Sequence, residues 1–158
     1  MKWITREHPK IDRIACPWLI SRYIDKDPEF LYVPADCVLS EAEATGAVPY
    51  DIPGVTLTHV GERCSFDTFL DQYELHDSSL QELAVIVRGA DTGRLDLAPQ
   101  CAGLLAVSLG LSRNFPDDHE MLERGLVIYD ALFAWCRYAR GEAHNWNYAS
   151  AGVRAASP

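Results

Sequence analysis

The alternation of hydrophobic and polar positions predicts helices throughout the second half of the chain. Ser79 and Glu82 have the spacing of a capping box, and apolar residues follow them at helical intervals. Asp117 and Glu120 repeat that spacing before the longest apolar face in the sequence. Residues 98–110 are apolar on nearly every side, which is typical of a buried central helix.

In the first half, short stretches with a period of two predict strands instead. We expect three short strands in one small sheet, at residues 3–6, 29–33 and 55–60. We expect helices at residues 17–24, 36–46 and 65–73. These elements predict an α+β fold, mostly α-helical with a small β-sheet in the N-terminal half. We expect the sheet to pack against the helices at residues 98–110 and 117–140.

With 158 residues, of which 48% are hydrophobic, the chain is long enough for one domain with its own core. We expect this domain at residues 1–141 and a tail at residues 142–158. The tail is rich in Ala, Asn, Ser and Gly, and its aromatic residues Trp146 and Tyr148 are the candidates for attaching part of it to the domain.

The net charge of −9 argues against affinity for nucleic acids and anionic membranes, because both attract basic patches. The N-terminus has no apolar signal core, and no apolar run approaches the ~20 residues that cross a bilayer. We therefore expect a cytoplasmic protein that by itself binds neither nucleic acid nor membrane. The sequence leaves a homo-oligomer open.

The five cysteines include no C-x-x-C pair, so neither a disulfide scaffold nor a four-cysteine zinc ribbon is indicated. Cys101 and Cys136 lie in apolar helical stretches and are expected in the core. If the first helix begins at Pro17, Cys16 is its N-cap, where the helix dipole lowers the pKa of a thiol. The alternative is that Cys16 is a half-buried structural cysteine.

The densest group of acid-base side chains is the run from His59 to Asp67. The strand expected at residues 55–60 directs His59 inward, and the helix after it carries Asp67 in its first turn. A buried imidazole needs a partner, because an unpaired polar group costs about 1–3 kcal/mol. A metal ion or a carboxylate would satisfy it. Alternatively, His59 bonds to a backbone carbonyl and Asp67 only complements the helix N-terminus.

Asp91 is expected at the end of a helix, where a carboxylate faces the negative end of the dipole unless a cation compensates. One cation shared by His59, Asp67 and Asp91 would give the buried imidazole a partner and would compensate the carboxylate at the helix end. One imidazole and two carboxylates suit a divalent or trivalent ion such as Fe, Mn or Zn. Cys64 and His119 are further candidate ligands.

Five segments together resemble the C-terminal domain of the chromate resistance protein B family. The matching segments are residues 12–20, 59–67, 88–91, 98–100 with 103–104, and 129–132 with 134–136, and the resemblance as a whole covers residues 3–137. The resemblance implies a role in chromate resistance or chromate-responsive regulation. Longer family members carry an N-terminal region linked to transcriptional control, and others a sulfurtransferase-like domain. This chain begins at the shared domain, so DNA binding is not expected of it. Family members often have glutamate in place of Asp67.

Three functional hypotheses follow. The first is a metal-binding domain with the His/carboxylate site described above. The second is a metal-dependent enzyme of redox or hydrolytic type, with Cys16 or Glu62 as a thiol or acid-base partner, and the sequence leaves such activity open. The third is a sensor in which Arg13, Arg63 and Arg88 hold a small oxyanion such as chromate or sulfate. The alternative for those arginines is ordinary surface ion pairing.

Overall fold

A computed structural model describes residues 1–144, so the expectations for Trp146 and Tyr148 lie outside the described residues. The described chain forms a three-stranded parallel sheet of order β2-β1-β3 and six α-helices. The central strand is β1 (Lys2–Arg6), flanked by β2 (Glu29–Val33) and β3 (Val48–Pro49). The expected α+β fold is confirmed.

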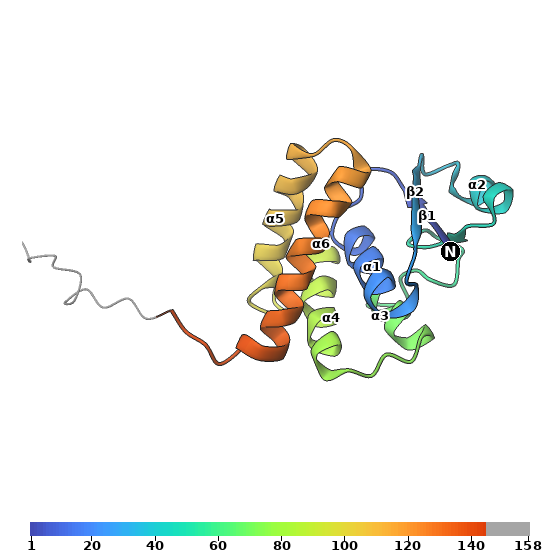
Figure 1. The fold of residues 1–158 in the computed structure, drawn as a ribbon. Coiled ribbons are helices and arrows are strands. Elements are labelled where there is room, and N and C mark those ends of the chain that lie inside the picture. The colour runs from blue at the N-terminus through green and yellow to red at the C-terminus, as the bar shows by residue number, and fades with distance from the viewer. Residues whose placement is uncertain (145–158) are drawn as a thin grey trace, which may run out of the picture.

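The helices fall into a large group on one side of the sheet and a single helix on the other, as Figure 1 shows. Their bounds are α1 (Asp12–Leu19), α2 (Val38–Thr45), α3 (Ser65–Gln72), α4 (Ser78–Asp91), α5 (Cys101–Asn114) and α6 (Asp118–Ala134). Short π-helical segments extend α1 and α6, at Ile20–Ile24 and Trp135–Ala139. Helix α1 lies at the centre of the large group and packs against α3, α4 and α6.

The two faces of the sheet are buried in different clusters. Trp3 of β1 is fully buried in the main core and packs on Phe69 of α3, with ring centroids 6.0 Å apart. The next residue, Ile4, points to the other face and packs in a smaller cluster with Val38 of α2. Successive side chains of a strand alternate in this way, and parallel sheets are usually covered on both faces.

The start of the first helix was predicted too late, at Pro17. Helix α1 begins at Asp12 and carries Pro17 inside it. Proline lacks the N–H that would bond to the carbonyl four residues earlier. Because the helix begins five residues before Pro17, Cys16 lies within α1 and is not its N-cap. Its side chain is fully buried.

The expectation that residues 98–110 form a fully buried helix was also wrong. Helix α5 buries Cys101, Leu104 and Ser108, but Val107 is 44% exposed and Leu109 49% exposed. Helices α5 and α6 lie side by side at the edge of the molecule farthest from the sheet (Figure 1), so the outer side of α5 faces solvent.

Helix caps were predicted with mixed success. Asp117 does cap α6, accepting a hydrogen bond from the Glu120 N–H at 2.8 Å. Helix α4 instead begins two residues earlier than Ser79 implied, because Asp77 caps it by accepting from the Ser79 and Leu80 N–H groups. No helix among residues 1–144 has both the length and the apolar character needed to cross a membrane.

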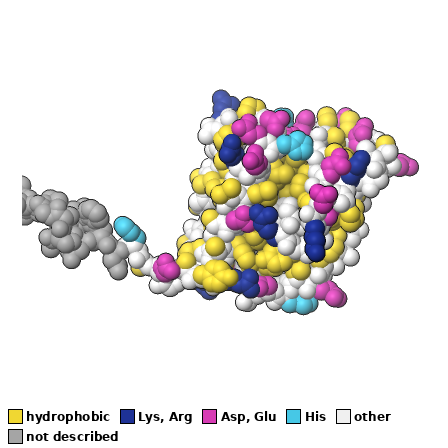
Figure 2. Space-filling model, viewed as in Figure 1, with side chains coloured by type: hydrophobic (Ala, Val, Ile, Leu, Met, Phe, Trp, Pro, Cys, Tyr) yellow, Lys and Arg dark blue, Asp and Glu magenta, His cyan; other side chains and the backbone are white. Residues whose placement is uncertain are grey.

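Acidic and basic side chains are interspersed on the face shown in Figure 2, with hydrophobic side chains exposed between them. Several of the basic side chains are paired, as in the ion pair between Arg22 and Asp130 of α6 at 2.7 Å. This face carries no continuous basic patch.

Candidate metal centre

His59 lies in the connection between β3 and α3, where the sequence had predicted a strand. The connection makes only isolated bridges, between Tyr50 and Leu57 and between Val60 and Arg63, so the strand expected at residues 55–60 does not form. The edge of β1 is already paired with β3. As a result, His59 does not point into the core, and 40% of its side chain is exposed.

Three carboxylates surround the imidazole of His59. Its Nε2 lies 3.5 Å from Asp12 Oδ2, 3.4 Å from Asp51 Oδ1 and 3.2 Å from Asp91 Oδ2. Asp12 is the first residue of α1 and Asp91 the last residue of α4. Within the described chain, Asp12, His59 and Asp91 form a group whose ligand atoms all lie within 4.8 Å of one another.

Asp12 is fixed by the N-terminus of α3. Its carboxylate accepts the backbone N–H of Ser65 at 2.7 Å and that of Phe66 at 3.0 Å. Its side chain is only 1% exposed. Free N–H groups and the positive end of the dipole favour an anion at this position. These two N–H groups hold the Asp12 carboxylate at the start of α3.

Asp51 is held by a different set of donors. The Ser65 hydroxyl donates to Oδ1 at 2.7 Å, and the Arg6 guanidinium donates to Oδ2 at 2.9 Å. Arg13 Nε lies 3.4 Å from the same Oδ2. Burial acts to raise the pKa of Asp51, but the donors His59, Ser65 and Arg6 outweigh it and lower the pKa. Asp51 is thus an ionised neighbour of the group that already has partners of its own.

The shared environment shifts the pKa values of His59 and Asp91 upward. The hydrogen-bonding carboxylates of Asp12 and Asp51 raise the pKa of His59 to about 10. Burial, followed by repulsion from Asp12 and Asp51, raises the pKa of Asp91 to about 7. The raised pKa of Asp91 therefore reflects its burial first and the repulsion of the two neighbouring carboxylates second.

A protonated His59 does not satisfy all three carboxylates. Nε2 carries a single hydrogen, which can point toward only one acceptor. The three distances, 3.2 to 3.5 Å, are longer than the ~2.7–2.9 Å of a charge-assisted hydrogen bond. Ligand atoms at about 2.1 Å from a tetrahedral ion lie about 3.4 Å from one another. The spacing of His59 from Asp12 and Asp91 fits that geometry.

Asp67, predicted from the sequence as the third ligand, lies outside this group. Its Oδ2 accepts the Cys64 N–H at 3.1 Å, which completes a capping box at the start of α3. The same oxygen lies 3.3 Å from Arg88 Nε of α4. Burial raises the pKa of Asp67 despite the opposing charge of Arg88. The structure thus brings together two of the three predicted ligands, with Asp12 in the third position.

The remaining candidate residues are also outside the group. Cys64 and Cys16 are fully buried, and burial raises the pKa of both thiols. Cys16 Sγ lies 3.5 Å from Asp12 Oδ1. His119 is exposed on α6, with its ring 5.5 Å from that of Tyr32. Glu62 is exposed.

The three arginines proposed for an oxyanion do not converge on one site, although Arg63 and Arg88 both lie beside Asp67. Arg63 pairs with Asp71 through two hydrogen bonds, and Arg88 lies against Asp67. Arg13 alone reaches the cluster, through Asp51, and its guanidinium also donates to two backbone carbonyls. Burial lowers the pKa of Arg13.

Asp12 and Asp51 are the residues that the sequence did not single out. Asp12 stands just before an apolar face formed by Ile14, Ala15 and Trp18, which is a helix-start signal that Pro17 obscured. Asp51 lies between two prolines in an irregular connection, where no periodic pattern could indicate its direction.

The fold and the cluster define an α+β domain whose one histidine and two carboxylates lie at cation-binding spacing. Residues 3–136 match the family model described as ChrB, C-terminal domain. The chain belongs to this family, as the resemblance had implied.

A curated relative, Protein ChrB of Cupriavidus metallidurans, is 34% identical over 133 residues. The match covers 84% of this chain and 40% of that protein, so the chain spans less than half the length of the relative. No solved structure matches the chain.

Proposed function

We propose that this chain is a cytoplasmic metal-binding domain of the chromate resistance system, with the ion held by Asp12, His59 and Asp91. Membership of the ChrB C-terminal domain family supports the association with chromate. The observation that carries the metal site is the spacing of the ligand atoms, which lie within 4.8 Å of one another around one imidazole.

The ligand set favours Fe, Mn or Zn. One imidazole and two carboxylates are nitrogen and oxygen donors of hard to borderline character. Three protein ligands leave coordination positions open for water or another molecule, as in metal sites that bind substrates. Asp51 Oδ1 lies 3.4 Å from His59 Nε2 and is already bonded to Ser65, while its Oδ2 accepts from Arg6, so Asp51 would border the coordination sphere without being one of the three ligands.

The main alternative is a metal-free ion-pair cluster in which protonated His59 balances the surrounding carboxylates. This alternative predicts the same structure but no bound ion. Metal analysis of the purified protein separates the two.

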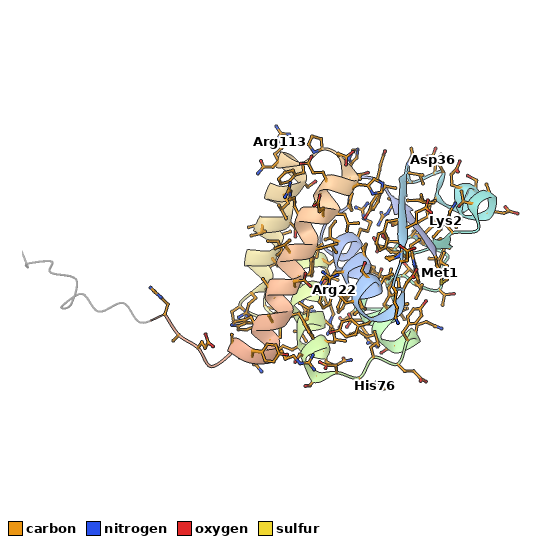
Figure 3. All side chains as sticks on the ribbon, in the orientation of Figure 1. Met1, Lys2, Arg22, Asp36, His76 and Arg113 are labelled. Atoms are coloured by element: carbon orange, nitrogen blue, oxygen red, sulfur yellow. The ribbon has the colours of Figure 1, made fainter. Side chains whose placement is uncertain are left out.

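The test is equilibrium dialysis of the full chain against Mn²⁺, Fe²⁺ and Zn²⁺, followed by elemental analysis. We expect about one ion per chain for at least one metal, and loss of that ion in His59→Ala and Asp91→Asn. His76→Ala is the matched control, because His76 lies exposed in the connection between α3 and α4 (Figure 3), outside the cluster. Substoichiometric metal in the parent protein, or equal loss in the control, would contradict the proposal.

A further inference from the structure

A cleft adjoins the proposed metal site and lies between the N-terminal segment and α5. Its volume is about 490 Å³. Both His59 and Asp91 line it, whereas Asp12 is buried behind them with 1% of its side chain exposed. An ion held by the three residues would therefore have its open coordination positions directed toward the cleft.

The charges around the cleft leave a positive excess once a metal is bound. Three basic residues, Arg6, Lys10 and Arg13, line it, and the acidic residues at the site are Asp12, Asp51 and Asp91. These charges cancel. A ligated imidazole is neutral, so a divalent ion adds two positive charges that no protein group balances.

One wall of the cleft is hydrocarbon. Ile11, Ala90, Leu105 and Leu109 line it, and 49% of Leu109 is exposed. A tetrahedral inorganic oxyanion offers only oxygen atoms to its surroundings and would leave this wall uncovered. The volume of the cleft is also within the ~300–1,000 Å³ typical of sites for small organic molecules.

We propose that the cleft binds a small organic dianion. One carboxylate completes the coordination of the metal, the hydrocarbon portion lies against Leu105 and Leu109, and Lys10 contributes to binding the negative charge. This inference rests on the metal site proposed above, and it names the class of ligand that the site takes.

The test uses glutarate as the probe, with sulfate as the inorganic dianion and butyrate as the monoanion. Each is titrated by calorimetry into the full chain loaded with the metal identified by dialysis, and metal content is measured again after each titration. We expect glutarate to bind about tenfold more tightly than butyrate and sulfate, because it combines two charges with an apolar segment.

Three exposed positions give matched variants. Leu109→Asn should weaken glutarate binding about threefold and leave sulfate unaffected. Lys10→Gln should weaken both dianions about threefold, since an exposed charge pair contributes modestly. Lys2→Gln is the control. Lys2, labelled in Figure 3, is the first residue of β1 and does not line the cleft, so the substitution should change the affinity for neither glutarate nor sulfate.

The outcomes separate the two proposals. A protein without bound metal contradicts the metal site itself. A metal-loaded protein that does not bind glutarate, or binds sulfate equally well, overturns the organic dianion alone. Equal glutarate affinity in the parent, Leu109→Asn and Lys10→Gln proteins would place the ligand outside this cleft and also overturn it.

Discussion

Asp67 stabilises the junction between α3 and α4. Within the described chain, none of its polar partners belongs to the His59 cluster. Its carboxylate accepts the Cys64 N–H and lies beside Arg88, and only 2% of its side chain is exposed. Removing one partner of a buried charge pair leaves the other uncompensated. Asp67 is therefore expected to matter for stability and to be dispensable for metal binding.

Asp67→Asn should lower the free energy of unfolding by about 1–3 kcal/mol, because it removes the charge that faces Arg88. Chemical denaturation of the metal-free protein measures this change. The metal stoichiometry of the folded variant should equal that of the parent. A loss of metal as large as that in Asp91→Asn would show that Asp67 is a ligand after all.

The raised pKa of His59 should make the proposed metal binding depend on pH. In the metal-free protein, the pKa of about 10 lies above the ordinary value of 6.5. Protonated His59 therefore stabilises the metal-free fold fully below about pH 6.5, and this stabilisation is lost as the pH rises through about 10. A metal must displace that proton before it can bind the imidazole.

Metal affinity should consequently rise about tenfold per pH unit between about pH 8 and pH 9, above the pKa of Asp91 and below that of His59, where one proton leaves His59 for each ion bound. Calorimetry in buffers of different ionisation enthalpy should detect the release of about one proton at pH 8. In the metal-free protein, the His59 ring signals in NMR spectra should remain those of an imidazolium at pH 8. An affinity that does not change over this range would contradict the ligand role of His59.

At the scale of the elements, the position of α1 depends on its close approach to α6. A Cβ placed on Gly125 of α6 would lie 2.5 Å from Ile14 Cγ2 of α1. Both residues are buried. Because α1 carries Asp12 at its start, this contact also positions one side of the proposed metal site.

Gly125→Ala should destabilise the protein by about 1–3 kcal/mol through overpacking, measured by thermal or chemical denaturation. Adding Ile14→Ala removes the clashing methyl group, so the double variant should lose less stability than the sum of the two single variants. Gly103→Ala on α5 is the control, because nothing lies within 4 Å of the added Cβ. It should be neutral or stabilising by about 0.5–1 kcal/mol. Additive losses in the double variant would show that the two helices do not meet at this point.

The elements that the sequence predicted well are those with a local signal. The apolar face of α6 and its Asp117 cap follow from spacing alone, and Gly46 ends α2 in the left-handed conformation that glycine favours. The strand expected at residues 55–60 failed because its pairing depends on a distant partner, and the two-residue β3 occupies that edge of β1. The exposed side of α5 likewise depends on which neighbours the fold provides.

Two members of the candidate cluster, His59 and Asp91, were singled out from the sequence for the same reason. His59 and Asp91 each carry a local anomaly, an imidazole among apolar residues and a carboxylate at a helix end. The structure places them 3.2 Å apart. Asp12 is more than forty positions away in sequence and joins them only because the start of α1 meets the start of α3, which no periodicity encodes.

At the scale of the whole molecule, the proposed ion would connect three distant segments. Asp12 begins α1, His59 lies in the connection before α3, and Asp91 ends α4. An ion that binds only when these segments are together stabilises the folded state over the unfolded chain.

A metal concentration of about 100 times the dissociation constant should raise the free energy of unfolding by about 2.7 kcal/mol. For a chain of this size the melting temperature should then increase by on the order of 5–10 °C. Differential scanning calorimetry should show this increase in the parent protein and in His76→Ala, and its absence in Asp91→Asn. A comparable increase in Asp91→Asn would indicate that the metal binds elsewhere.

The most direct test of the proposed metal site is an anomalous diffraction map of crystals grown with Zn²⁺ or Mn²⁺, with data recorded at the absorption edge of the metal. The proposed site requires one strong peak about 2.0–2.2 Å from His59 Nε2 and from carboxylate oxygens of Asp12 and Asp91. A map without a peak between these three side chains, or with its strongest peak at the cysteines or on the surface, would contradict it.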